Sequence, residues 1–301
     1  MAIDILAAFE QEPPELDFIW PGFLAGTVGA LIAPGATGKS FYALAAAISV
    51  AAAGEGGDLM NFHAKRGPVA YFAGEDPEPA IIRRLHAFGA HLDPHARKAT
   101  ADMLFIETVL GSRLDVMNQT HVQAIIDRYA GCRLIVFDTL SRIHQLDENS
   151  NGDMARLVSQ LEYIAAQTGA SVLYLHHVSK ASARDGTGDQ QQAGRGASAL
   201  IDNARWCGFI TKMTEKESEN LSDRRYDAKP IGKENADRFL RFGISKQNYD
   251  TPQPDRWLER RAGGVLLPVD LRSSNVEATL KSKTSNKTKG GSQHADEEDS
   301  W

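Results

Sequence analysis

The sequence predicts an α/β fold with a mostly parallel β-sheet that helices cover on both faces. Short apolar runs typical of buried strands alternate with longer segments of helical periodicity along most of the chain. A loop at 33–40 joins one of these strands to a helix, which is the order of elements around a phosphate-binding loop. The chain of 301 residues with 42% hydrophobic content is long enough to bury a large core.

The phosphate-binding loop lies between an apolar run at 28–32 and a helix that we expect from Phe41 to Ala53. Glycines let backbone N–H groups close around the β- and γ-phosphates, Lys39 supplies a cation, and the Ser40 hydroxyl is a ligand for Mg²⁺. Ala33 stands where the usual pattern has its first glycine, which weakens the motif modestly. The predicted nucleotide-binding residues are Pro34, Gly35, Ala36, Thr37, Gly38, Lys39 and Ser40.

Three regions are predicted: an N-terminal arm at 1–23, a folded domain at 24–272, and a disordered tail at 273–301 that is basic and then acidic. The arm combines a short amphipathic segment with two prolines, so we expect it to pack on a neighbouring subunit. In the domain, the predicted strands and helices follow in order: strand 69–73, helix 77–89, strand 103–107, helix 119–130, strand 133–139, helix 154–167 and strand 171–177.

Beyond Ser179 the predicted pattern changes. Residues 184–196 form a polar, glycine-rich stretch, for which we expect a mobile loop. Strands at 204–212, 237–247 and 256–261 alternate polar and apolar residues, so we expect them to extend the sheet in antiparallel fashion. Residues 214–234 are charged and predicted to lie at the surface.

Acidic and histidine side chains follow several of the predicted strands, where ligands bind in open α/β sheets. Asp138 ends an apolar strand and is predicted to hold Mg²⁺ on the metal side of the site; a helix-capping role is the alternative. Glu75 is predicted to orient or deprotonate the attacking water, with Asp76 supporting it or capping the next helix. His177 is predicted to sense the γ-phosphate, and His176 to be structural because it points to the opposite face.

Arg205 lies outside the strands that form the predicted site. Phosphoryl transfer needs positive charge on the developing negative oxygens, which an arginine from a neighbouring subunit often supplies. Arg205 is a candidate for that role, and a salt bridge or a surface charge is its alternative.

Composition and charge exclude some classes of protein. The net charge of -6 argues against a protein that simply coats nucleic acid, although it leaves room for a local basic channel. No apolar run approaches the roughly 20 residues that span a bilayer, and the start lacks a signal pattern, so the expected place is the cytoplasm. Cys132 and Cys207 lack the spacing of a zinc site and are predicted to be structural.

These residues resemble the RepA replicative helicases of broad-host-range plasmids, which are hexameric rings of RecA-like ATPases. The resemblance covers nearly the whole folded chain. Its most specific parts are the run from Leu175 to His177 and the run from Gly188 to Gln192. Shared runs include Gly38-Lys39-Ser40, Leu175-His176-His177, Gly188-Asp189-Gln190-Gln191-Gln192, Glu75-Asp76-Pro77 and Asp138-Thr139-Leu140. The chain departs from the family at 214–233, which is longer, and in its tail.

The resemblance implies a RecA-like P-loop ATPase core with antiparallel C-terminal strands, ATP and Mg²⁺ as cofactors, and a homohexamer with ATP sites between subunits. It gives Glu75 the role of catalytic base, His177 that of sensor, and Arg205 that of a finger in the neighbour's site, with Arg84 and Arg261 as further arginines of the site. The loop at 180–195 would face single-stranded DNA in the central channel. The implied DNA contacts are Lys180, Arg184 and Arg195.

The leading hypothesis is therefore an ATP hydrolase of the helicase class that moves along single-stranded DNA and unwinds a forked duplex in plasmid replication, with an initiator or primase as a further partner. One alternative is a recombinase-like filament on DNA. Another is a plasmid regulator whose ATPase domain switches assembly without separating strands. A small-molecule kinase is disfavoured because the sequence has no lid motif.

Overall fold

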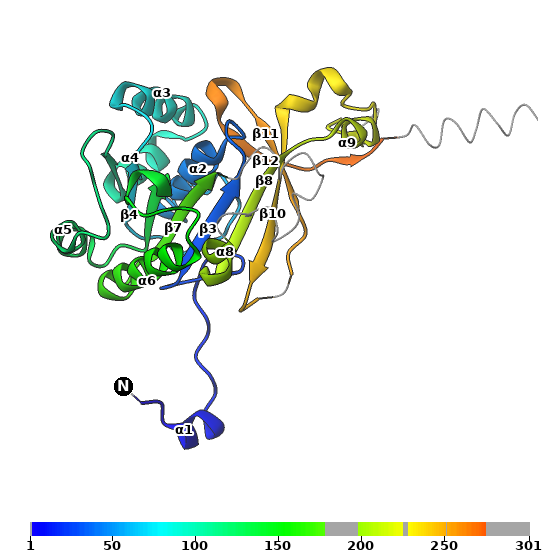
Figure 1. The fold of residues 1–301 in the computed structure, drawn as a ribbon. Coiled ribbons are helices and arrows are strands. Elements are labelled where there is room, and N and C mark those ends of the chain that lie inside the picture. The colour runs from blue at the N-terminus through cyan, green and yellow to red at the C-terminus, as the bar shows by residue number, and fades with distance from the viewer. Residues whose placement is uncertain (1, 178–197, 225–227, 251, 275–301) are drawn as a thin grey trace, which may run out of the picture.

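The computed structural model describes residues 2–177, 198–224, 228–250 and 252–274. These residues contain a nine-stranded sheet in the order β12-β11-β10-β8-β3-β7-β6-β4-β5, and helices cover both faces (Figure 1). The predicted α/β fold with a mostly parallel sheet is confirmed. The strands are β3 (Val28–Ala33), β4 (Val69–Ala73), β5 (Leu104–Thr108), β6 (Leu134–Asp138), β7 (Ser171–His177), β8 (Trp206–Lys212), β10 (Phe239–Gln247), β11 (Arg256–Arg260) and β12 (Leu266–Val269).

The direction of β8 differs from the expectation. β8 pairs with β3 in parallel, and the antiparallel part of the sheet begins only at β10, which pairs with β8. The short helix α8 (Ser198–Asn203) packs against α6 and delivers the chain to the amino edge of the sheet, where the Arg205 N–H donates to the Val28 carbonyl at 2.8 Å. A strand that starts again at the amino edge runs parallel to its neighbour. β10, β11 and β12 then follow as antiparallel neighbours, as predicted.

The two faces of the sheet bury separate apolar cores. Successive side chains of a strand point to opposite faces. Leu31 accordingly belongs to the core under one group of helices, and Ile32 to the core under the other. The first group is α2 (Lys39–Ala51), α3 (Glu78–Gly89) and α4 (Pro94–Met103), and the second is α5 (Gln119–Tyr129), α6 (Asn151–Thr168) and α8.

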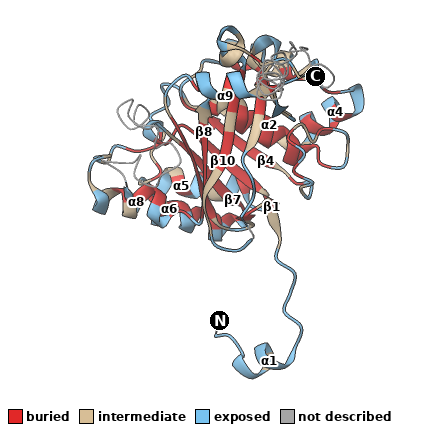
Figure 2. Ribbon diagram, turned by 90° about the vertical axis from the view of Figure 1, so that its right-hand side faces the viewer, coloured by how far each residue is buried: buried red, intermediate tan, exposed pale blue. Residues whose placement is uncertain are grey.

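The packed body begins earlier than the predicted boundary at residue 24. A hairpin of β1 (Phe18–Trp20) and β2 (Phe23–Leu24) lies in the first core, where Trp20 stacks on Phe62 with ring centroids 5.1 Å apart. Just before it, the two carboxylate oxygens of Asp17 accept hydrogen bonds from the Arg133 guanidinium at 2.8 and 2.9 Å. The helix α1 (Ile5–Glu10) has no buried residue and stands away from the body on an extended segment (Figure 2).

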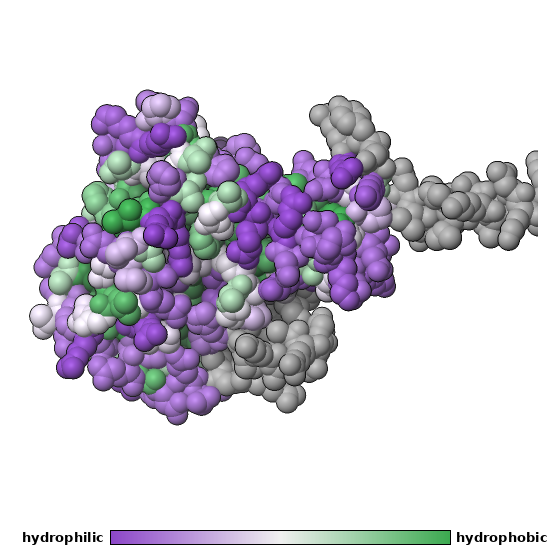
Figure 3. All heavy atoms as spheres, turned by 90° about the horizontal axis from the view of Figure 1, so that it is seen from above, coloured by the Kyte–Doolittle hydropathy of each residue, from purple (hydrophilic) through white to green (hydrophobic). Residues whose placement is uncertain are grey.

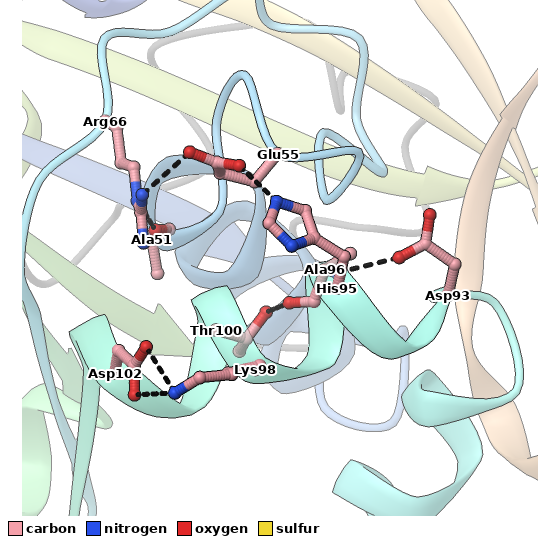
Figure 4. A network of polar contacts seen from close by, with 9 residues as sticks. All are labelled: Ala51, Glu55, Arg66, Asp93, His95, Ala96, Lys98, Thr100 and Asp102. Atoms are coloured by element: carbon pink, nitrogen blue, oxygen red, sulfur yellow. Dashed lines mark hydrogen bonds and ion pairs between the residues drawn. The ribbon is translucent and has the colours of Figure 1, made fainter.

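The helix α4 is absent from the sequence prediction although local signals mark it. Asp93 caps it by accepting a hydrogen bond from the Ala96 N–H at 2.8 Å, and a proline occupies its first turn. Glu55, beyond the end of α2, pairs with both Arg66 and His95, so α4 is fastened to the α2 side of the core (Figure 4).

The charged stretch after β8 is mostly exposed in its described residues, as expected, and it also forms a short helix over a small apolar cluster. α9 (Glu215–Asn220) begins with a capping box in which Thr214 and Glu217 bond each other's backbone N–H groups. Ile231 and Phe239 are buried beneath it. The remaining short elements are β9 (Leu221–Ser222), which pairs with β13 (Arg272–Ser273), and the 3-10 turns η1 (Leu140–Arg142), η3 (Lys233–Arg238) and η4 (Ala262–Gly264). Among the described helices, none has the length and apolar character needed to cross a membrane.

Candidate active site

The predicted phosphate-binding loop connects β3 to α2 at the carboxyl edge of the sheet. Gly38 adopts φ 104°, a left-handed conformation that favours glycine, and it leads into α2 without any side-chain cap. The Thr37 hydroxyl donates to the Pro34 carbonyl at 2.7 Å and closes the loop on itself. The uncapped N–H groups at the start of α2 therefore remain available for an anion. Figure 3, seen from above, looks onto this edge, where most surface residues are hydrophilic.

Lys39 is buried, with 4% of its surface exposed, and its ammonium group is held by neighbouring oxygen and nitrogen atoms. Lys39 Nζ donates to the carbonyls of Ala33 at 2.8 Å and Pro34 at 3.0 Å, and it lies 2.9 Å from His177 Nδ1. Burial lowers the pKa of Lys39 to about 8, although the carboxylates of Asp138 and Glu75 oppose this shift. The ammonium group therefore lies at the loop, largely shielded from solvent.

Asp138 ends β6 and is almost completely buried. Its two carboxylate oxygens accept hydrogen bonds from the Ser40 hydroxyl at 3.1 Å and the Tyr71 hydroxyl at 2.6 Å. Burial raises the pKa of Asp138, whereas these two hydrogen bonds act to lower it.

The oxygen atoms of Ser40 and Asp138 fit Mg²⁺, which in nucleotide sites takes one or two protein oxygens and completes its shell with phosphates and water. In the part of the chain that the structure describes, no group of three or more His, Cys, Asp or Glu side chains forms a metal site. A cation here would consequently depend on the nucleotide for most of its ligands.

His177 links the lysine to the predicted catalytic base. Because the Lys39 ammonium can only donate, His177 Nδ1 is the acceptor, and the ring proton is assigned to Nε2. That nitrogen lies 3.4 Å from Glu75 Oε1. Lys39, His177 and Glu75 therefore form a continuous chain beside the loop. His176, the next residue back, is half-buried, and burial lowers its pKa to about 4, so it remains neutral.

Asp76 and Arg84 form an ion pair at 2.7 Å, and the Arg84 guanidinium lies over the Phe41 ring, 4.8 Å from its centroid. α3 has Pro77 at its N-cap position and no side-chain cap, so Asp76 does not fill the capping role left open for it. Arg84 approaches the site from α3, close enough for its charge to lower the pKa of Asp138. Both residues remain predicted participants.

The structure brings Arg260 to the phosphate-binding loop, a residue that the sequence interpretation missed. Arg260 Nη2 donates to the Thr37 carbonyl at 3.3 Å, whereas the predicted residue Arg261 pairs with Glu259 at 2.7 Å. Successive residues at the end of a strand point to opposite sides, which explains why neighbours have different partners. Tyr71 was also missed, because in sequence it is one apolar residue of a buried strand.

Arg205 lies at the opposite edge of the sheet from the loop. It precedes β8, it is exposed, and its N–H bonds to the first residue of β3, while the loop follows the last residue of β3. Lys180, Arg184 and Arg195, the predicted DNA contacts, lie outside the described residues, as does the loop predicted at 184–196. Their role stays a prediction.

Two solved structures share this fold. A structure titled as an ATPase domain superposes with a TM-score of 0.54 and 13% sequence identity. The match covers 88% of this chain and 96% of that one. A structure titled RadB recombinase gives a TM-score of 0.50 and 13% identity, with coverages of 81% and 90%. At these identities the likeness establishes the fold, a RecA-like ATPase core.

A protein family described as an AAA domain matches residues 3–183, which is more than half of the chain. The matched segment contains the phosphate-binding loop, β4 with Glu75 after it, β6 with Asp138, and β7 with His177. With that match and the geometry of the loop, this chain belongs to the AAA domain family of P-loop ATPases.

Proposed function

We propose that this protein is a replicative DNA helicase of the RepA kind, which hydrolyses ATP between the subunits of a ring, moves along single-stranded DNA and separates the duplex ahead of it. The placement of Arg205 carries the proposal. β3 spans six residues, so about 20 Å separate Arg205 from the loop of its own subunit. In the described part of the chain this arginine has no ion-pair partner. An arginine in that position can serve an ATP site only in another subunit.

The described side chains support hydrolysis at the loop. When ATP binds, the Lys39 ammonium exchanges the Ala33 and Pro34 carbonyls for phosphate oxygens. His177 Nδ1 then loses its donor, so the ring responds to the presence of the γ-phosphate. Glu75 orients the attacking water and takes its proton. Ser40 and Asp138 would hold Mg²⁺, which would supply positive charge to the phosphate oxygens.

The exposed helix α1 supports assembly into an oligomer. Its apolar side chains include Leu6 and Phe9, which are 65% and 82% exposed. The body carries an apolar groove of about 670 Å³ between α2, α3, α4 and β5, lined by residues such as Leu85, Phe88 and Ile106. We expect α1 of one copy to occupy this groove on a second copy, because each then covers apolar surface that its own subunit leaves exposed.

Strand separation on a forked duplex tests the proposal. The wild-type protein is expected to release the labelled strand when ATP and Mg²⁺ are present, and Lys39→Ala is expected to release none. Lys98→Ala is the matched control, because Lys98 lies on the surface of α4 and pairs with Asp102 at 3.2 Å, away from the loop. An intact fork in the presence of DNA-stimulated ATP hydrolysis would refute the helicase.

A filament-forming recombinase is the second candidate, supported by the fold shared with the structure titled RadB recombinase. The two candidates predict different assemblies on DNA, a closed ring or a helical filament. Electron microscopy of the protein on single-stranded DNA with a non-hydrolysable ATP analogue separates them. ATP-dependent assembly that needs no DNA and leaves the fork intact would instead favour a regulator.

A further inference from the structure

A polar pocket of about 360 Å³ lies at the carboxyl edge of the sheet, apart from the phosphate-binding loop. Two loops form it, one after β5 and one after β6, and the Val116 N–H joins them by donating to the Ile143 carbonyl at 2.8 Å. Both loops leave from the edge that carries the ATP site. The lining residues are Arg113, Leu114, Arg142, His144 and Gln145.

The two arginines of this pocket lack carboxylate partners. Arg113 and Arg142 are both exposed, and within the described residues neither forms an ion pair. Several other described arginines are paired with carboxylates, as Arg133 is with Asp17 and Arg84 with Asp76. Two guanidinium groups that line one pocket without counter-charges of their own favour an anionic ligand.

His144 lines the same pocket with its ring buried. The Leu146 N–H donates to His144 Nδ1 at 3.1 Å, so the ring proton is assigned to Nε2. The side chain is 2% exposed, and Nε2 has no hydrogen-bond partner within the described residues. Glu148 Oε1 is 3.9 Å away, too far to accept a hydrogen bond. The same burial leaves Nε2 practically no surface for a ligand, so His144 shapes the wall of the pocket and the open polar groups are those of the two arginines and Gln145.

The acidic groups near His144 do not close the pocket to an anion. Asp115 accepts a hydrogen bond from the Met117 N–H at 2.8 Å, which turns one of its carboxylate oxygens toward its own loop. Glu148 belongs to the segment before α6 and is not among the lining residues. The lining itself offers two guanidinium groups and an amide, together with the apolar surface of Leu114.

We propose that this pocket binds a backbone phosphate of single-stranded DNA, with Arg113 and Arg142 donating to its oxygens. The proposal rests on the proposed function, because it names a contact for the same DNA. A volume of about 360 Å³ lies within the range of small-ligand sites and suits a nucleotide unit better than a lone phosphate ion. The sugar then lies against Leu114.

The pocket lies close to the backbone that carries the predicted catalytic base, Glu75. A Cβ atom added to Gly74 would come within 2.6 Å of Arg142 Cβ, so the two residues pack tightly. Gly74 donates to the Asp138 carbonyl at 2.6 Å and immediately precedes Glu75. A phosphate held by Arg142 is therefore connected, through the contact of Arg142 with Gly74, to the backbone that positions Glu75.

Fluorescence anisotropy with labelled oligothymidylate, in the presence of a non-hydrolysable ATP analogue, tests the pocket. Arg142→Gln and Arg113→Gln are each expected to weaken binding roughly tenfold and to lower the slope of log affinity against log salt by about 0.7, as expected for one lost phosphate contact on a single strand. The matched control is Arg83→Gln, which removes an exposed arginine of α3 that does not line the pocket. Circular dichroism shows whether each variant is folded.

The outcomes separate the pocket from the proposed function. If the wild-type protein binds no oligothymidylate, the proposed function and the pocket both fail. If it binds and Arg142→Gln binds equally well with an unchanged salt slope, only the pocket fails. An oligothymidylate with a neutral methylphosphonate backbone should abolish the difference between wild type and Arg142→Gln, and a difference that persists would mean that the pocket reads bases rather than phosphates.

Discussion

The carboxyl and amino edges of the central sheet differ in how completely their polar groups are partnered. At the carboxyl edge, Lys39, Ser40 and Asp138 are held by contacts within the same subunit. At the amino edge, Arg205 is exposed, and the helix α1, which stands away from the body, has exposed apolar side chains. The difference teaches that the side chains of the carboxyl edge are positioned within one subunit, whereas Arg205 and α1 have the exposure that the proposed contacts with another copy require.

Removing the side chain of Arg205, at the amino edge, should have the largest effect on ATP hydrolysis. Arg205→Ala should reduce ATP hydrolysis about 10³-fold while ATP binding persists, because the arginine stabilises the transition state and not the bound nucleotide. Hydrolysis is measured by phosphate release, and binding by the fluorescence of a labelled ATP analogue.

Mixing variants shows whether Arg205 acts across a subunit boundary. Lys39→Ala subunits retain Arg205, and Arg205→Ala subunits retain Lys39, so mixed oligomers contain some complete sites. Two inactive preparations should regain activity when combined. Normal hydrolysis by Arg205→Ala alone, or a mixture that stays inactive although the subunits exchange, would remove Arg205 from the neighbour's site.

The second prediction concerns the exposed helix. Changing both Leu6 and Phe9 to serine should weaken subunit association about 100-fold, because two apolar side chains lose their burial in the assembly. Analytical ultracentrifugation measures the change. Leu110→Ser is the control, since Leu110 is 47% exposed but lies in the loop after β5. Unchanged association of the double variant would show that α1 has no role in assembly.

A smaller effect is expected where the antiparallel strands support the loop. Arg260→Gln should lower ATP affinity roughly tenfold, because it removes the donor to the Thr37 carbonyl and a positive charge beside the phosphates. Arg238→Gln provides the control, since Arg238 pairs with Glu259 on the other side of β11. Equal ATP affinities of the two variants would show that Arg260 does not contribute to ATP binding.

The smallest effect follows from the buried ammonium of Lys39. Burial lowers its pKa to about 8 in the free protein, and bound phosphates favour the charged form, so above pH 8 ATP binding requires uptake of a proton. The affinity for ATP should therefore fall about fivefold between pH 8 and pH 9. Calorimetry in buffers of different ionisation enthalpy should detect proton uptake at the higher pH and none near pH 7. Absence of uptake at both pH values would contradict the assigned pKa.

Local sequence predicted the elements best where burial is continuous. The strands at 69–73 and 171–177 have the predicted bounds, because each is an apolar run bounded by turn residues. α4 was missed because its buried face consists only of Ala96, Ala99 and Thr100, which make a weak apolar pattern in the sequence. The antiparallel direction predicted for β8 was also wrong. Whether a strand pairs in parallel or antiparallel depends on the path of the connecting chain, which the sequence of the strand does not reveal.

The candidate site divides in the same way. The expectation that strand ends converge brought Glu75, Asp138 and His177 to one edge of the sheet, where the structure places them near Lys39. Tyr71 and Arg260 were not foreseen, because neither lies in a motif and each reaches the site only through tertiary packing. Such residues become visible when distances, rather than sequence neighbours, define the site.

The fork of hydrogen bonds between Asp17 and Arg133 has a mechanical consequence. Asp17 ends the extended segment that carries α1, and Arg133 immediately precedes β6, whose last residue is Asp138. A strand paired on both sides is stiff along its axis. In the oligomer proposed above, tension on the arm would therefore act on the end of β6 opposite to Asp138, which would couple assembly through α1 to the acid beside Ser40.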